Sequence, residues 1–582
     1  MYLKRWGVLA LVCIGLGSCT PIDQPTPIRV DETPTSAQPT QSATPTSRMD
    51  TISGVVMDEK GPVSGAVVRV QTTASYAVSD EQGRFTLLLE DPMAEDLNLT
   101  GWAKGYFCSG PFVASAGDHD VVVQLTHHSD EDNPDYQWLP SRFYPGEGEN
   151  QGCAECHSRE GTDFSFSLPV DEWLLDAHSQ SATNARFLTM YNGTDLQGNQ
   201  SPLTRKGSSR DYGSFPLPPD PSKPYYGPGY KLDFPDSAGN CASCHTPAAA
   251  VNDPYNTDPN NLSGVEAEGM PCDFCHKVWD VKLDPNTQMP NPNYPGVLSI
   301  EFLRPHEGHQ FFAGPLDDVA PGEDTYSAIQ DESAYCAACH FGVFWDITIY
   351  NSYGEWLESP YSDPETGQTC QDCHMPPTGA TQFATTEAGG LVRDPDQIFS
   401  HRMPGALDRE LLEDALDMQV IAAREGDILR VTVTLYNDNT GHKIPTDSPL
   451  RHMLLVVEAS NDAGEPLTQI EGPVLPSWAG EGSPARGYYA GQPGKGYALI
   501  LQEIWTEISP SGAYWNPTRV VEDTRLQPFQ EDFSQYEFQI SYAGDVQVRV
   551  RLLLRRAFIE MMDQKGWSDS DILMTEEVLA IK

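Results

Sequence analysis

Cysteine and histidine recur in this chain in one fixed arrangement. At five places, two cysteines separated by two residues are followed at once by a histidine: Cys153, Cys156 and His157; Cys241, Cys244 and His245; Cys272, Cys275 and His276; Cys336, Cys339 and His340; Cys370, Cys373 and His374. This is the attachment pattern of a c-type haem, in which two thiols form thioethers to the macrocycle and the adjacent imidazole binds the iron. We therefore predict five covalently bound haem c groups and redox chemistry.

Two other readings of the same cysteines fit less well. Structural zinc needs tetrahedral sites built from pairs of Cys-x-x-Cys, and five motifs cannot all be paired in that way. Zinc also gives no reason for a histidine after every second cysteine. A thioredoxin-like dithiol is expected once, within a βαβ unit, and not five times along a chain. The motifs account for ten of the thirteen cysteines.

The N-terminus predicts export. Lys4 and Arg5 precede an apolar run over residues 6–16, which is too short to span a bilayer and is typical of a secretory signal. The run ends in Leu-Gly-Ser-Cys19, which resembles a bacterial lipobox. That resemblance implies a lipoprotein signal over residues 1–19 and a lipid anchor at Cys19, on the outer face of a bacterial membrane, periplasmic or at the cell surface. The alternative is an ordinary signal peptide with an unrelated cysteine.

Composition restricts the rest of the chain. Residues 20–50 are rich in Pro, Thr, Ser and Gln without apolar periodicity, which predicts a disordered linker. The 582 residues are 39% hydrophobic, enough for several domains with cores of their own. The formal net charge of −47 excludes nucleic acid as a natural partner. The acidic residues are spread along the chain, so they indicate a solvated surface, and they leave open the steering of a basic redox partner.

Residues 51–127 alternate short apolar runs with Gly and Asp turns, as in Ile52–Asp58, Gly61–Val70 and Ser79–Phe85, which predicts a small β-sandwich. With the later runs at 102–106 and 121–125, this segment resembles the carboxypeptidase regulatory-like domain, which has a transthyretin-like or immunoglobulin-like fold. The resemblance implies an accessory module without catalysis. Cys108 is expected to be a buried core thiol, with an intermolecular disulfide as the alternative.

Residues 128–405 carry all five motifs and little regular apolar patterning, which predicts short helices and loops around the haems. The short gaps along the chain group the second motif with the third and the fourth with the fifth, as two haem pairs after a leading haem. The segment from Trp173 to His178 is similar to one in cytochrome c-552/4-type multihaem domains, and this resemblance implies that His178 is a distal iron ligand. Four more histidines are candidate distal ligands: His306, His309, His401 and His442. For three of them, His306, His309 and His442, a surface or supporting role is the alternative.

The other histidines and two methionines are expected to have different roles. His452 lies in a strand-like run and is predicted to be structural. His119, His127 and His128 flank the last strand of the first module; His127 and His128 are reserve ligands for the first haem. Met270 and Met375 adjoin haem motifs and are predicted to pack there, because so close to its own motif a residue is held near the proximal side.

Beyond residue 405 the pattern changes to strands. Apolar or alternating runs at 428–436, 453–459, 497–504 and 546–554 predict an immunoglobulin-like β-sandwich over residues 406–582, with helical pieces at 407–416 and 557–565. The loop carrying His442 is expected to reach the haem segment. The motif Asp523–Pro528 has no chemistry that the sequence assigns, and a structural turn is expected there.

The predicted function is electron transfer by an exported pentahaem cytochrome whose haems mostly have two histidine ligands. Two axial imidazoles leave no open position for a substrate and favour low potentials. Its partners are expected to be redox proteins, basic ones or other multihaem cytochromes, and the membrane through Cys19. The alternative is an oxidoreductase that reduces a small nitrogen or sulfur oxyanion at a haem with one open position. No catalytic residue is assigned. An adhesive surface protein is a third class.

Overall fold

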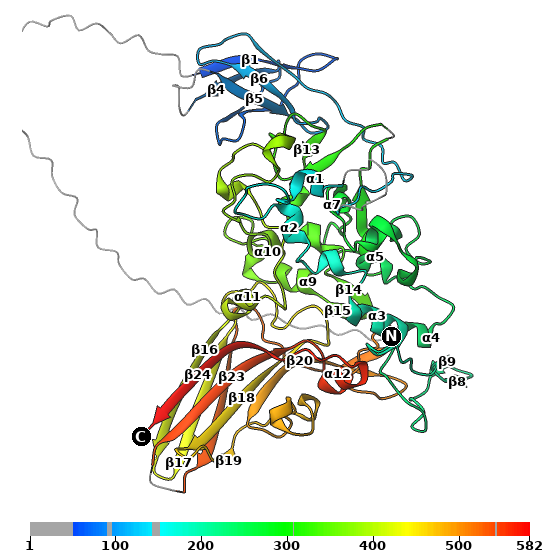
Figure 1. Ribbon diagram of the computed structural model, residues 1–582, viewed down its shortest axis with the longest axis vertical. Helices are drawn as coiled ribbons and strands as arrows, with labels where there is room; N and C mark the ends of the chain where they lie inside the picture. Colours follow the sequence, from blue (N-terminus) through cyan, green and yellow to red (C-terminus); the bar gives the residue numbers. More distant parts are fainter. Residues whose placement is uncertain (1–50, 90–95, 143–151, 307, 542–543) are drawn as a thin grey trace, which may run out of the picture. The chain divides into compact units, whose positions relative to one another are not determined.

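The computed structural model describes residues 51–89, 96–142, 152–306, 308–541 and 544–582 (Figure 1). The predicted signal, Cys19 and the predicted linker over residues 20–50 lie outside these ranges. The described chain belongs to one unit built mostly of strands, with few and short helices. Within the described ranges, no helix has both the length and the apolar character needed to cross a bilayer. The predicted boundaries near residues 127 and 405 stay predictions.

Two small sheets form the first part of the described chain. In the first sheet β1 (Thr51–Met57) lies between β4 (Arg84–Leu88) and β7 (Val121–Gln124), antiparallel to β4 and parallel to β7. The second sheet has the order β3-β2-β5-β6, with strands β3 (Tyr76–Val78), β2 (Val67–Val70), β5 (Leu97–Trp102) and β6 (Ser109–Ala114). Alternate residues of β4 are buried, because successive side chains of a strand point to opposite faces. Ile52, Phe85 and Leu99 belong to one shared core.

Polar bonds join these sheets to residues 317–325. Arg69 forms a salt bridge to Asp317 with Nε 2.6 Å from Oδ1, and the Trp102 indole donates to the Thr325 hydroxyl at 3.0 Å. Cys108 is buried at this contact, and its amide donates to the carbonyl of Asp324 at 2.7 Å. Its thiol is a buried group, as predicted, and burial raises its pKa well above the ordinary range.

The Asp324 carboxyl at the same contact makes the stability of the protein depend on pH. Burial raises its pKa to about 7, although the nearby Lys277 ammonium opposes the shift. Between about pH 4 and about pH 7 the folded protein keeps a proton that the unfolded chain releases. The stabilisation that comes from protonated Asp324 is therefore complete below about pH 4 and is lost as the pH rises from about 4 to about 7.

We expect Asp324→Asn to remove this loss. The free energy of unfolding of the variant minus that of wild type should be larger at about pH 8 than at about pH 5. Denaturant unfolding at both pH values measures it. A difference between variant and wild type that stays constant with pH would contradict the assignment.

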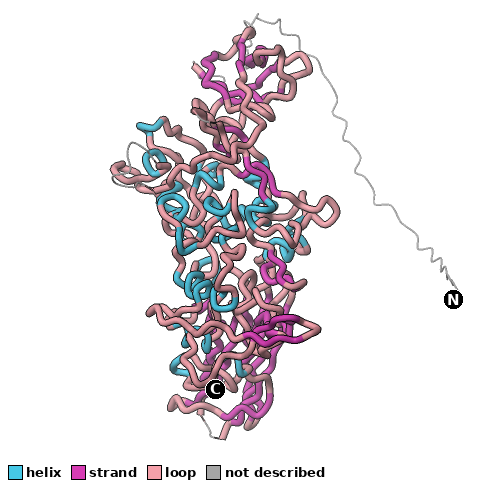
Figure 2. Tube along the Cα trace, turned by 90° about the vertical axis from the view of Figure 1, so that its right-hand side faces the viewer, coloured by secondary structure: helices cyan, strands magenta, loops and turns pink. Residues whose placement is uncertain are grey.

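Residues 152–405 are mostly loop, and Figure 2 shows their helices as short cyan segments. No helix in this part exceeds eight residues: α1 (Ala154–His157), α2 (Pro169–Trp173), α3 (Ala185–Asn192), α4 (Tyr230–Asp233), α5 (Ala242–His245), α6 (Pro247–Ala250), α7 (Cys272–Cys275), α8 (Ala334–Ala337), α9 (Ser352–Leu357) and α10 (Cys370–His374). Four two-stranded ladders accompany them: β8 (Lys206–Ser209) with β9 (Gly213–Pro216), β10 (Val278–Val281) with β11 (Ile300–Phe302), β12 (Phe312–Gly314) with β13 (Asp324–Tyr326), and β14 (Gly342–Phe344) with β15 (Ile347–Tyr350). This agrees with the predicted short helices and loops.

Two larger sheets form the C-terminal part. The first has the order β16-β17-β22-β19, with strands β16 (Asp417–Glu425), β17 (Ile428–Tyr436), β22 (Glu531–Gln539) and β19 (Thr468–Glu471). The second has the order β21-β20-β18-β23-β24, with strands β21 (Thr518–Asp523), β20 (Gly494–Glu503), β18 (His452–Asn461), β23 (Val546–Arg555) and β24 (Ile572–Ile581). Helices α11 (Arg409–Asp414) and α12 (Ile559–Lys565) lie within the two predicted helical pieces.

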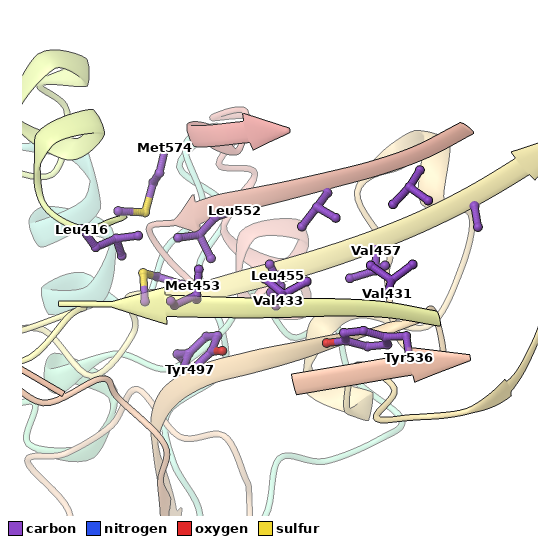
Figure 3. Close-up of a cluster of buried hydrophobic side chains, with 14 of the residues drawn as sticks. Leu416, Val431, Val433, Met453, Leu455, Val457, Tyr497, Tyr536, Leu552 and Met574 are labelled. Carbon is purple, nitrogen blue, oxygen red and sulfur yellow. The ribbon is translucent and has the colours of Figure 1, made fainter. Parts of the chain in front are cut away.

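Side chains from both of these sheets meet in one core (Figure 3). Val431 and Val433 of β17 are fully buried with Leu455 of β18 and Leu552 of β23. Alternate residues of β17 face this core, which is why the sequence pattern identified the strand.

The loop that carries His442 is fixed from both sides. Glu355 of α9 accepts from the Thr446 hydroxyl at 2.6 Å, from the Lys443 amide at 3.2 Å and from the Arg525 guanidinium at 3.0 Å. Arg525 and Asp523 also pair with each other, at 2.8 Å. The loop therefore reaches the haem segment, as predicted, and the unassigned motif Asp523–Pro528 supplies part of the connection.

Candidate haem sites

The five motifs lie on short helical turns. Four of the motif helices begin within one residue of the first cysteine of their motif: α1, α5, α7 and α10. The histidine amide donates to the carbonyl of the first cysteine in the first four motifs, at 2.9 to 3.1 Å. On a helical turn, residues three apart share a face, so the two thiols of a motif lie on one side. This geometry suits two thioethers to one macrocycle.

Thiols of different motifs are also neighbours. Cys153 of the first motif lies beside Cys272 of the third. Cys339 of the fourth motif lies beside Cys244 of the second, and Cys336 beside Cys370 of the fifth. The fourth motif thus adjoins the second and the fifth. The predicted grouping of the fourth motif with the fifth agrees with these neighbours. The predicted grouping of the second motif with the third does not, because the second lies beside the fourth and the third beside the first.

Three motif histidines each face another histidine from elsewhere in the chain. The ring centres of His276 and His401 are 6.5 Å apart, and those of His374 and His442 are 6.4 Å apart. The rings of His340 and His178 have centres 6.1 Å apart. The second member of each pair is one of the histidines that the sequence nominated as a distal ligand.

This spacing fits two imidazoles on one iron. A metal–imidazole bond is about 2 Å long and a ring centre lies about 1 Å behind its nitrogen, so trans imidazoles have centres about 6 Å apart. Rings that stack directly on each other lie closer than this: the ring centres of Phe187 and His245 are 3.9 Å apart. The residues present therefore fit haem iron.

Hydrogen bonds at Nδ1 leave Nε2 of most of these rings for a metal. His276 donates to the carbonyl of Ala313 at 2.8 Å and His374 to that of Pro404 at 2.7 Å. A carbonyl only accepts, so Nδ1 carries the proton and Nε2 has a free lone pair. Three other rings use Nδ1 in the same way, those of His157, His401 and His442. Such bonds orient metal-binding histidines.

Burial keeps the imidazoles of His401 and His442, two of the candidate distal ligands, in the neutral form that binds a metal. Burial and, to a smaller extent, the neighbouring His276 ring lower the pKa of His401 to about 4. Burial likewise lowers the pKa of His442 to about 4. Both rings are therefore neutral at pH 7, as metal ligation requires.

Two motif histidines have no such pair among the described histidines. His157 donates to the carbonyl of Phe383 at 2.7 Å, and the ring of His245 stacks on Phe187. The two remaining candidates, His306 and His309, are exposed. Their loop is tied to the segment before the first motif, because Asn133 donates to the carbonyl of Pro305 at 3.0 Å. Their assignment stays a prediction.

The other residues discussed from sequence lie apart from these pairs. His119 contacts the Ser53 hydroxyl, and His127 stacks against Tyr106 in the first sheets. His128 is buried among Phe107, Trp279 and Phe311. His452 is buried in β18 against Phe558, consistent with a structural role.

Two carboxylates next to iron-ligand candidates were not found from sequence. Asp176 and Asp447 approach the rings of His178 and His340, respectively. Asp176 stands two residues before His178, a local signal that was available. Asp447 comes from the C-terminal part of the chain, far from His340, and nothing in the sequence relates the two.

Comparison with known proteins gives one distant resemblance to a haem protein. No protein-family model matches this chain, and no curated protein does. A pentahaem cytochrome c552 from Thermochromatium tepidum is similar at 17% identity and TM-score 0.48, over 74% of this chain and 97% of that chain. The PapD-like domain 7 of human CEP192 matches at 7% identity and TM-score 0.12, over 29% of this chain and 86% of that domain. The Mu homology domain of Danio rerio Fcho1 matches at 9% identity and TM-score 0.10, over 29% of this chain and 50% of that one. These values assign neither a family nor a function.

Proposed function

We propose that this chain is a pentahaem c-type cytochrome that transfers electrons through closely spaced haems. The observation that carries the proposal is the set of three imidazole pairs at the spacing of a single iron, each built on a Cys-x-x-Cys-His motif. The bound haems would supply one-electron exchange between ferric and ferrous iron. The resemblance of residues 51–127 to a carboxypeptidase regulatory-like module stays a prediction.

The protein's own residues would hold, orient and bring together the redox centres. The two rings of each pair would hold one haem iron and would leave no position on it for substrate. In the pairs of His276 and His374, backbone carbonyls at Nδ1 fix the ring positions, so little rearrangement would accompany a change of charge. Contacts such as that between Cys336 and Cys370 bring neighbouring attachment points together. This supports exchange of electrons between centres.

We also propose the setting in which this occurs. Export with a lipid anchor at Cys19 places the haem segment outside the cytoplasm, and the net charge of −47 suits a basic redox partner or another cytochrome with basic patches around its haems. These points are supported by the sequence alone.

Counting haems and electrons tests the proposal. The denatured full-length protein is expected to retain five haems per chain, because thioethers survive unfolding. Voltammetry of the folded protein on an electrode should integrate to five electrons, with no catalytic current when nitrite or sulfite is added. Fewer than five covalent haems, or haems that exchange no electrons with the electrode, would refute it.

One observation favours a second function. His157 and His245 have no facing imidazole among the described histidines, so one of these irons could keep an open position for a small oxyanion. A reductase of this kind would bind carbon monoxide at one ferrous haem and give catalytic current with nitrite or sulfite. If carbon monoxide binds at no haem, the reductase is excluded and the pure carrier stands.

A further inference from the structure

The pair formed by His178 and His340 differs from the other two in the charge that lies behind its rings. Nδ1 of His178 lies 2.7 Å from a carboxylate oxygen of Asp176. Nδ1 of His340 lies 3.7 Å from a carboxylate oxygen of Asp447. Carboxylates therefore stand behind both rings of this pair.

In the other two pairs every ring donates to a neutral carbonyl. His276 and His401 use Ala313 and Phe399, at 2.8 and 3.1 Å. His374 and His442 use Pro404 and Lys443, at 2.7 and 3.0 Å. Among the three pairs, only that of His178 and His340 has carboxylates within 4 Å of Nδ1, one of them hydrogen-bonded to His178.

Both carboxylates are largely shielded from solvent. Asp176 is 3% exposed, and its Oδ1 also accepts from the amide of His178 at 2.8 Å. The side chain of Asp447 is 19% exposed, and its backbone is left-handed with a φ of 66°. Among non-glycine residues, Asp and Asn adopt that conformation most readily. Its Oδ1 is buried and has no hydrogen-bond partner among the described residues.

A carboxylate behind a metal-bound imidazole makes the imidazole a stronger donor. Stronger donation, and the added negative charge itself, stabilise ferric over ferrous iron, which lowers the reduction potential. A weakly solvated site strengthens the effect, because screening is small there. Two carboxylates act in the same direction on one iron.

We propose that Asp176 and Asp447 are positioning residues that make the haem between His178 and His340 the lowest in potential of the three paired haems. The proposal rests on the proposed function. This haem belongs to the fourth motif, whose thiols contact those of the second and fifth motifs. A low-potential centre beside the haem of the fifth motif is an energetic step for electrons that pass between these two haems.

The experiment is a redox titration of the full-length haem protein, monitored by optical and electron paramagnetic resonance spectra. The rings of His178 and His340 cross at 75°, whereas those of the other pairs cross at 26° and 17°. The angle between axial rings changes the anisotropy of a low-spin ferric signal, so this haem can be followed separately.

We expect Asp176→Asn and Asp447→Asn each to shift the midpoint of this one haem to a more positive potential. The double variant should shift it further. Asn suits both sites because it keeps the shape of Asp and accepts the left-handed backbone at residue 447. Asp176→Glu, which keeps the charge, should lie closer to wild type than Asp176→Asn. A purely structural role would not give this order.

Asp363→Asn is the matched control, because this exposed carboxylate lies outside the five motifs and accepts from the amides of Glu365 and Thr366. It should leave the midpoint of the His178–His340 haem unchanged. An unshifted midpoint in both single Asn variants, or an equal shift in the control, would overturn the proposal. If Asp447→Asn does not fold, Asp176→Asn and Asp176→Glu still decide it. The proposed function fails separately, if the wild-type protein lacks five redox-active haems.

Discussion

Replacing His401 by alanine is expected to convert one of the five haems from low-spin to high-spin. The ring of His401 faces His276 at 6.5 Å and is held neutral and buried, so its loss removes one of two strong-field ligands from a single iron. The backbone stays fixed, because the amide of His401 donates to Glu172 at 2.7 Å whatever side chain follows. The change should appear in the ferric optical and paramagnetic resonance spectra.

Two controls make the His401→Ala result specific. Free imidazole should restore the low-spin spectrum, because the missing ring leaves space for it. His119→Ala removes a histidine in the first sheets that contacts Ser53, and it should leave every haem signal unchanged. A fully low-spin spectrum for His401→Ala would show that His401 is not an iron ligand.

The second large effect is expected at the buried ion pair that fixes the His442 loop. The side chains of Arg525 and Glu355 are 8% and 2% exposed, with their charged atoms 3.0 Å apart. Burial raises the pKa of Glu355, and the Arg525 guanidinium opposes that shift. Arg525→Met leaves a buried carboxylate without its cation, which typically costs about 3–5 kcal/mol.

We expect Arg525→Met to lower the free energy of unfolding by about 3–5 kcal/mol and to loosen the loop that carries His442. Denaturant unfolding followed by circular dichroism measures the first effect, and a high-spin signal from the haem of His374 and His442 reports the second. The double variant Arg525→Met with Glu355→Leu should recover part of the lost stability, because the buried carboxylate is gone and Asp523 keeps its pair with Lys443 at 3.0 Å.

An exposed ion pair provides the comparison for Arg525→Met. Arg409 and Glu413 are one turn apart on α11 and their side chains are 70% and 45% exposed. Breaking an exposed pair of this kind by Arg409→Met should cost less than about 0.5 kcal/mol. If Arg525→Met and Arg409→Met lower the free energy of unfolding by the same amount, the buried ion pair does not fix the loop.

Local patterns made parts of the fold and site predictable. The alternation in residues 428–436 corresponds to β17, because one face of that strand packs in the core and the other does not. The short helices around the motifs and the burial of Cys108 also agree with the structure. The reach of the His442 loop agrees as well, through its bonds to Glu355. Except for the reach of the His442 loop, which joins Lys443 to Glu355 across 88 positions of the chain, each of these features depends on residues close together in the chain or on burial alone.

Contacts between distant segments were not predictable in the same way. The sequence nominated His178, His401 and His442 as ligands but did not say which motif each would face. It grouped the second motif with the third, whereas thiol contacts join it to the fourth. Asp447 had no sequence signal at all, because its role depends on a loop of the C-terminal part lying against His340.

The sequence by itself determined the chemistry of attachment, because two thioethers and a proximal imidazole come from five consecutive residues on one helical turn. It also identified histidines outside the motifs that are candidates for the second iron ligand. Only the tertiary structure decided the partner of each motif and the charge behind each ring. The histidine that faces a motif histidine comes from another loop, at any separation along the chain. Packing of those loops therefore decides which motif histidines face a second imidazole and which pair lies near carboxylates.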